Sequence, residues 1–309
     1  MSDRTDYKII SSTLKQTAKD GNLFMSILTL VSSLLIIIVF LFNDNLRAPN
    51  YYFLLAIAIS ELLGSVSIIT NFGLDKDQSE TLISFILNLI EIFSDFFVTL
   101  FITFIAYCIY ILIVKGERDS NKKVKLFIIV GTIVSVLYTI ILAIVHIKSA
   151  PENSYSKIKL GYYSDNQCIS QLIHYIIILI ITAVNIFFFI RTIIFLNAKN
   201  KQDKKNGYKL MKTRNLLINY PLIGTSWIVL SLISFIIQNI ISGNNDNDIG
   251  KLRLIYIFIF IANLFTYLRG AFIFIIFIKS KKVTAIFYSI GACLYRCLKK
   301  INMNQMPSS

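Results

Sequence analysis

The chain has 309 residues, of which 55% are hydrophobic and 16% are charged, with a mean hydropathy of +0.67 and a net charge of +14. A soluble domain is about 45–50% apolar and about 25% charged, so a soluble enzyme, a nucleic-acid-binding domain and a disordered chain all fit poorly. Four Cys in a chain of this length argue against a disulfide scaffold. The composition indicates a membrane protein with several spans.

Seven apolar runs are long enough to cross a bilayer, which takes about 17–25 residues. We expect transmembrane helices over residues 23–43, 51–72, 82–114, 126–147, 168–196, 216–242 and 254–278. Barrel strands alternate over about ten residues, and these runs do not. The sequence therefore predicts an all-α membrane protein with a seven-transmembrane helix bundle over residues 23–278.

The distribution of basic residues predicts the orientation, because Lys and Arg accumulate in cytoplasmic loops. With the amino terminus outside, twenty of the 31 Lys and Arg fall in cytoplasmic segments and ten in outer segments. Residues 1–22 then form an extracellular tail, and residues 301–309 a short cytoplasmic end. The basic runs either set topology and attract membrane lipids or also hold a cytoplasmic partner.

Short motifs on several predicted spans resemble one receptor family. The third span ends in Tyr-Ile-Leu-Ile-Val-Lys (residues 110–115), and the sixth begins with Leu-Ile-Asn-Tyr (217–220) ahead of Trp227. Glu61 lies in the second span, and Arg269-Gly270 in the seventh. In this order the motifs resemble those of the cyclic-AMP receptors of social amoebae and their receptor-like relatives.

The resemblance implies a G-protein-coupled receptor of the plasma membrane. Such a receptor senses an extracellular small-molecule ligand, a cyclic nucleotide or another, and activates a heterotrimeric G protein. Family members tend to carry a Cys at the outer end of the third span, bridged to the second outer loop. This third span begins Thr81-Leu82-Ile83-Ser84. The chain also lacks the long Ser-rich tail, so these departures favour a divergent member.

Four ionisable residues, Glu61, Glu91, Asp95 and Arg269, lie inside the predicted spans. Charges there are costly and imply a partner and a function. Glu91 and Asp95 are four residues apart and share a helix face, so they either share a proton or hold a cation between them. A buried Arg269 needs a carboxylate. The cluster is a structural ion pair, a switch that rearranges on activation, or a ligand contact.

Three further residues bear on ligand binding or switching. His174 lies near the outer end of the fifth span, where an interfacial side chain is the more common role and ligand contact the alternative. Pro221 removes a backbone hydrogen bond from the sixth span and should bend it six residues before Trp227. The bend either opens the cytoplasmic face or is a static kink with a packed Trp.

The cytoplasmic ends of the third, fifth and sixth helices are the predicted G-protein site. Tyr110 and Val114 lie four residues apart and so share one helix face. The basic residues around them are Lys115, Arg118, Lys209, Lys212 and Arg214. A topology and lipid-binding role for these charges is the alternative.

Residues 279–300 carry apolar side chains at spacings of three and four between basic ends. This pattern is typical of an amphipathic helix lying on the membrane, here on its cytoplasmic side. Cys293 and Cys297 lie one turn apart on the bilayer side and suit palmitoylation, with unmodified thiols as the alternative.

Other functions are less well supported by the sequence. An intramembrane aspartyl protease needs two Asp within spans, and only Asp95 qualifies. We expect no enzyme activity, cofactor, metal site or nucleic-acid partner. The serious rival is an ion or small-solute transporter or channel that uses Glu61, Glu91, Asp95 and Arg269 as a path. Seven spans without an internal repeat argue against it, and a scaffold without signalling is a third reading.

Overall fold

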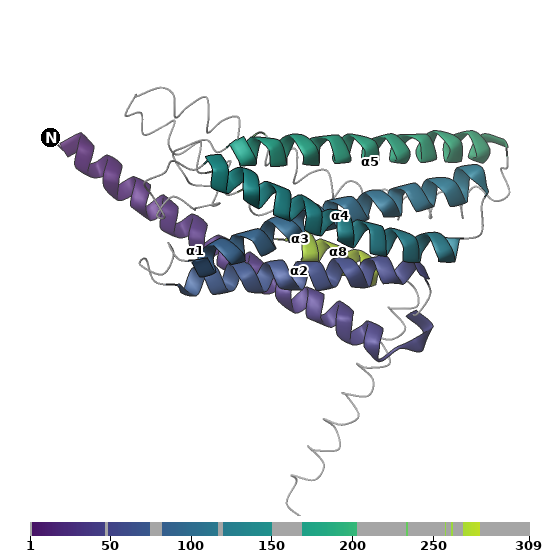
Figure 1. Cartoon of the computed structure of the whole chain (residues 1–309), viewed down its shortest axis with the longest axis horizontal. Helices are drawn as coiled ribbons and strands as arrows, with labels where there is room; N and C mark the ends of the chain where they lie inside the picture. The colour runs from purple at the N-terminus through teal and green to yellow at the C-terminus, as the bar shows by residue number, and fades with distance from the viewer. Residues whose placement is uncertain are drawn as a thin grey trace, which may run out of the picture.

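The computed structural model describes residues 2–46, 49–74, 82–116, 120–149, 169–202 and 268–278, together with the single residues 233, 257 and 261. These parts of the chain are helical and contain no β-strand. The helices are α1 (Ser2–Leu41), α2 (Pro49–Gly73), α3 (Leu82–Tyr110), α4 (Ser120–Ser149), α5 (Ile169–Gln202) and α8 (Arg269–Ile278). A 3₁₀ turn, Asp44–Leu46, follows α1, and a π-helical turn, Ile111–Lys115, extends α3. Figure 1 shows the long helices running side by side as a bundle.

Five of the seven predicted spans are confirmed as helices long and apolar enough to cross a membrane. Their apolar stretches are Asp20–Leu41, Tyr51–Gly73, Leu82–Lys115, Lys123–Val145 and Ile173–Lys199. The sixth predicted span, at residues 216–242, lies outside the described residues apart from position 233, as does the predicted amphipathic helix at 279–300. The helix α8 is the second part of the seventh predicted span.

The first helix is longer than its membrane span. Its 40 residues correspond to about 60 Å at 1.5 Å per residue, whereas the hydrocarbon core is about 30 Å thick. Residues 2–22 of the predicted outer tail therefore form the first half of a continuous helix. Residues 2–20 contain no Gly or Pro that would stop it. Figure 1 shows this half of α1 projecting past its neighbours.

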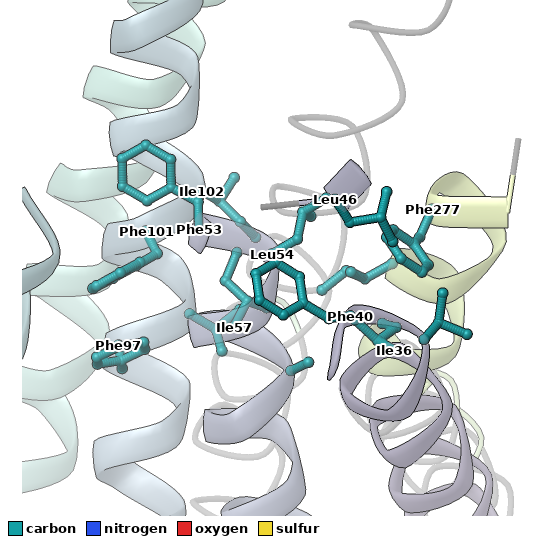
Figure 2. Close-up of a cluster of buried hydrophobic side chains, with 14 of the residues drawn as sticks. Ile36, Phe40, Leu46, Phe53, Leu54, Ile57, Phe97, Phe101, Ile102 and Phe277 are labelled. Atoms are coloured by element: carbon teal, nitrogen blue, oxygen red, sulfur yellow. The ribbon is translucent and has the colours of Figure 1, made fainter. Parts of the chain in front are cut away.

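A buried apolar cluster holds α1, α2, α3 and α8 together, with rings at its centre (Figure 2). Phe101 stacks on Phe97 with ring centroids 3.9 Å apart and meets Phe53 edge-on at 5.9 Å. Its other buried members include Ile36, Phe40, Leu46, Leu54, Ile57, Ile102 and Phe277. Because lipid is as apolar as these side chains, the close van der Waals contacts between them, and not their removal from water, pack the helices together.

The opposite surfaces of the helices are apolar and exposed. On α4 alone the exposed residues include Leu126, Ile129, Ile133, Leu137, Ile140, Ile141 and Ile144. A soluble protein rarely shows a contiguous apolar patch larger than a few hundred Å². Such a surface suits contact with lipid, so the fold is that of a multi-pass membrane protein.

Candidate functional site

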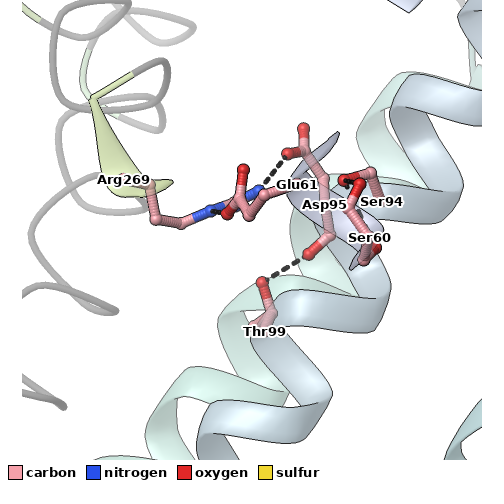
Figure 3. A network of polar contacts seen from close by, with 6 residues as sticks. All are labelled: Ser60, Glu61, Ser94, Asp95, Thr99 and Arg269. Carbon is pink, nitrogen blue, oxygen red and sulfur yellow. Dashed lines mark hydrogen bonds and ion pairs between the residues drawn. The ribbon is translucent and has the colours of Figure 1, made fainter. Parts of the chain in front are cut away.

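A buried arginine joins three helices at the centre of the described bundle. Arg269, the first residue of α8, is only 2% exposed. Its Nε donates a hydrogen bond to Glu61 Oε1 on α2, and its Nη2 donates to Asp95 Oδ1 on α3 at 3.0 Å (Figure 3). The predicted pairing of Arg269 with carboxylates of other spans is therefore confirmed, with Glu61 and Asp95 as the partners.

Close packing of α2 on α3 brings the two carboxylates together. Ser94 Oγ donates to the backbone carbonyl of Ser60 at 2.8 Å. A Cβ atom at Gly64 would lie only 2.7 Å from Ser94 Oγ, so the glycine is what lets the two helices approach this closely. Glu61 and Asp95 each follow one of the two serines directly in the sequence, and the approach therefore places both acids at the same level.

The arginine reaches them because α8 packs tightly on α1. A Cβ atom at Gly270 would overlap Cγ2 of Thr29 and would come within 3.4 Å of Ser33 Oγ. Glycine at this position removes that obstruction, and Arg269 next to it extends toward α2 and α3. The Arg-Gly pair of the sequence motif thus combines a charge with the space needed to place it.

Polar contacts between α2 and α3 continue from Ser60 toward Gly73. Ser67 Oγ donates to the carbonyl of Leu87 at 2.5 Å, Asn71 Nδ2 donates to Asn88 Oδ1 at 3.1 Å, and Ser84 Oγ donates to Asn71 Oδ1 at 2.9 Å. This polar seam was not predicted from the sequence. Its signal is the recurrence of small or polar residues every three or four positions at 60, 64, 67 and 71, a spacing typical of close helix pairs in membranes.

A small cavity lies beside the ion pair. It has a volume of about 20 Å³ and is lined by Thr29, Glu61, Gly64, Ser65, Ile68, Glu91, Ser94, Asp95 and Arg269. One water molecule needs about 10–15 Å³, so the cavity has room for about one water and none for a nucleotide. Glu91 therefore shares the site through the cavity. Among the described residues, no group of three or more His, Cys, Asp and Glu is placed to hold a metal ion.

His174, for which an interfacial role and a ligand contact were the alternatives, lies inside the described bundle. His174 is buried, and a 2.7 Å hydrogen bond joins its Nδ1 to the hydroxyl of Tyr138 on α4. The Tyr138 ring in turn stacks on Phe96 of α3, with centroids 3.9 Å apart. The imidazole can be buried because Tyr138, 36 positions away in the sequence, supplies its hydrogen-bond partner. His174 thus links α5 to α4.

The described part of the predicted coupling site lies at the end of α3. Residues Ile111–Lys115 form a π-helical turn, which ends at Gly116 in a left-handed conformation with φ 71°. The half-buried ring of Tyr110 lies 5.4 Å from that of Phe188 on α5, Val114 is half-buried and Lys115 is exposed. Turns of this kind are frequent at functional sites, and the sequence pattern did not predict it.

The remaining predicted site residues lie outside the described part of the chain. They are Arg118, Lys209, Lys212, Arg214, Pro221, Trp227, Cys293 and Cys297. Their proposed roles in coupling, bending and lipidation therefore stay predictions.

Apolar helices of spanning length around a buried ion pair define a multi-pass α-helical membrane protein. The family described as 7 transmembrane receptor (Secretin family) matches residues 22–273, and the chain belongs to this family of G-protein-coupled receptors. Such receptors signal to G proteins in response to extracellular ligands and are typically not enzymes. No curated protein matches the chain. The match supports a receptor but not the cyclic-AMP receptor family in particular, which stays a prediction from the motifs.

Proposed function

We propose that the chain is a receptor for an extracellular small molecule that activates a heterotrimeric G protein, with the Arg269 ion pair as its switch. The observation that carries the proposal is that one buried guanidinium holds carboxylates of two other helices. Arg269, Glu61 and Asp95 therefore fix the position of α8 against α2 and α3. We call these three residues the lock.

An ion pair of this kind suits a helix contact that has two states, one with the ion pair made and one with it broken. Removing one partner of a buried ion pair leaves an unpaired charge and typically costs about 3–5 kcal/mol, so a partial opening is unfavourable. The helices therefore occupy one of two discrete arrangements, and intermediate positions are not populated. A ligand shifts such an equilibrium only by its differential affinity for the two arrangements.

The ligand contacts other parts of the receptor. The cavity that the described residues form at the lock has room for about one water and none for a molecule of nucleotide size. We therefore place the ligand nearer the outer face or on the outer loops. A cyclic nucleotide is the first candidate, and the motifs at residues 110–115 and 217–220 support it.

The G protein binds at the end of α3 and the adjoining segments. Tyr110, Val114 and Lys115 form this end of α3, and Arg118, Lys209, Lys212 and Arg214 complete the basic ring around it. These charges steer an acidic partner, and a bend at Pro221 opens the space it enters. The asymmetry of Lys and Arg supports this face as cytoplasmic, and with it an outer amino terminus in the plasma membrane.

The carboxyl-terminal segment anchors the receptor on the cytoplasmic side. Residues 279–300 lie on the membrane as an amphipathic helix, and Cys293 and Cys297 carry acyl chains. The apolar spacing between basic ends supports this arrangement. Hydroxylamine-sensitive incorporation of a palmitate analogue into the wild-type chain, lost in a Cys293→Ala, Cys297→Ala double variant, tests it.

The proposed function is tested with the full chain in lipid nanodiscs and a panel of purified heterotrimeric G proteins. Cyclic AMP and cyclic GMP are the probe ligands, and nucleotide exchange on the G protein is measured. We expect exchange above that of empty nanodiscs with at least one heterotrimer, and loss of that exchange in a Lys212→Ala, Arg214→Ala double variant at equal protein level. Exchange at the empty-nanodisc level throughout, together with ion flux in proteoliposomes, would instead support the transporter.

A further inference from the structure

The last turn of α3 holds an extra residue. Residues Ile111–Lys115 are π-helical, a form in which backbone hydrogen bonds join residues five apart in place of four. The turn ends at Gly116, whose left-handed φ of 71° stops the helix. At 3.6 residues per turn, one extra residue changes the direction of the side chains that follow it by about 100°. The π turn therefore determines where Val114 and Lys115 point.

The helix is held in place immediately before this turn. The ring centroid of Tyr107 lies 5.7 Å from that of Phe127 on α4 and 5.1 Å from that of Phe188 on α5. Tyr110 lies 5.4 Å from the same Phe188. These ring contacts fix α3 as far as Tyr110, so a rearrangement of the turn leaves the body of the helix where it is.

The sequence of the turn is also compatible with an α-helix. Ile-Leu-Ile-Val-Lys (residues 111–115) contains neither Gly nor Pro, and Leu and Lys are good helix formers. Ile111 is buried, Val114 is half-buried, and Leu112 and Lys115 are exposed. Because π-helices are rare and α-helices common, the surroundings of the turn, and not its sequence, select the π form.

We propose that residues 111–115 convert between this π-helical turn and an α-helical one, and that the conversion is a switch at the end of α3. In the α form the last side chains of the turn move about 100° onward around the helix axis, so Val114 takes the direction that Lys115 has now. An apolar side chain then replaces a cation on that face. The π form accompanies the closed lock and is the resting form. The effect on the G protein rests on the proposed function, whereas the conversion itself does not.

Deletion of Leu112 tests the conversion, because it removes the extra residue and leaves a regular α-helix. Leu112 is 45% exposed, so its loss opens no cavity in the core. Hydrogen–deuterium exchange of the full chain in nanodiscs, read on the peptide 109–116, measures the opening of the turn. We expect this peptide to exchange about tenfold more slowly in the deletion variant, the change given by a hydrogen bond that no longer opens. Equal rates in the wild type and the variant would overturn the proposal.

The matched control is deletion of Leu126, which is 57% exposed and lies near the start of α4. This part of α4 is a regular α-helix, so the deletion rotates residues 120–125 by about 100° and moves the buried Val124 out of the core. The thermal unfolding midpoint should fall in the Leu126 deletion and should equal or exceed the wild-type value in the Leu112 deletion. An equal fall in both would show that the turn holds no extra residue, and would overturn the proposal.

Nucleotide exchange on purified heterotrimers without agonist separates this proposal from the proposed function. The Leu112 deletion fixes Lys115 in its resting direction, so it should lower any exchange that the wild type supports above empty nanodiscs. Unchanged exchange in that variant would overturn the role of the turn as a switch. If the wild type supports no exchange, it is the proposed function that fails, and the amide exchange rates still decide whether the turn converts.

Discussion

The two halves of α3 pack in different ways. From Ser84 to Asp95 its contacts with α2 and α8 are directional, and they include the Ser94 hydrogen bond and the Asp95 ion pair. From Phe97 to Tyr110 its contacts are between aromatic rings, edge-on with a ring of α2, stacked with one of α4 and tilted against one of α5. Directional polar contacts select one arrangement and make departures from it discrete, whereas van der Waals contacts between apolar side chains hold the helices together in lipid without selecting one arrangement as sharply.

We infer from this difference that the polar half contains the proposed switch and the ring half is a scaffold. A buried ion pair adds little net stability compared with apolar side chains of similar volume, yet its rupture is costly. We therefore expect substitutions in the polar half of α3 to change signalling as well as stability. Substitutions in the ring half, apart from Tyr110 at the proposed G-protein site, should change stability alone.

The largest effect is expected for Arg269→Ala. It leaves Glu61 and Asp95 buried without their cation, which should cost about 3–5 kcal/mol of stability and lower the surface level of the receptor. Thermal unfolding of the purified chain measures the loss, with Lys125→Ala as an exposed control of the same charge. Neutralising the partner in an Arg269→Gln, Glu61→Gln variant should restore part of it. Wild-type stability of Arg269→Ala would show that the lock does not hold the helices.

Phe101→Ala tests the scaffold half. Phe101 is fully buried between Phe97 and Phe53, and truncation of such a ring typically costs about 3–5 kcal/mol through lost contacts and a cavity. Phe42→Ala removes a ring that is 86% exposed and should cost far less. Comparison of the two unfolding midpoints measures the difference. Similar midpoints for the two variants would contradict the placement of the core.

Gly270→Ala asks whether the approach of α8 to α1 positions the lock. The added methyl group would overlap Thr29, and overpacking of this kind typically costs about 1–3 kcal/mol. Gly73→Ala is the matched control, because a Cβ at the end of α2 meets nothing within 4 Å and alanine is the better helix former. Differential scanning fluorimetry should show a lower midpoint for the first and an equal or higher one for the second. The reverse order would refute the close approach.

The smallest effect is expected for Tyr138→Phe. The substitution keeps the stack on Phe96 but removes the hydroxyl that bonds to buried His174, which typically costs about 1–3 kcal/mol. Tyr107→Phe keeps the ring contacts with Phe127 and Phe188 and serves as the comparison. Chemical unfolding of both variants in one detergent measures which of them loses more stability. A larger loss for Tyr107→Phe would count against the role of the hydrogen bond.

The sequence predicted five spans that the structure describes as helices, and it predicted that Arg269 pairs with a carboxylate of another span. Long apolar runs have no other stable location, so five of them could be read directly as helices. Arg269 had to find a carboxylate, but Glu61, Glu91 and Asp95 were equal candidates. Which carboxylates Arg269 reaches depends on the packing of Gly270 against Thr29. That contact joins two helices far apart in the sequence, so no local sequence pattern indicates it.

Other features were missed for the same reason. The burial of His174 depends on Tyr138, which belongs to another helix, so the isolated residue resembled an interfacial side chain. The π-helical turn at Ile111–Lys115 has the same apolar composition as an α-helix. The polar seam had a readable spacing on α2, but its partners on α3 became evident only once the register of the two helices was known.

The central claim, that the ion pair is a switch, is tested most directly by nucleotide exchange without agonist. Purified heterotrimers are mixed with the wild-type chain, with Glu61→Gln, or with Ser65→Ala, which alters the same cavity without touching the ion pair. We expect Glu61→Gln to loosen α8 from α2 and to raise basal exchange above that of the wild type and of Ser65→Ala at equal protein level. A Glu61→Gln variant that loses thermal stability yet exchanges nucleotide at the wild-type rate would show that the ion pair only holds the fold together.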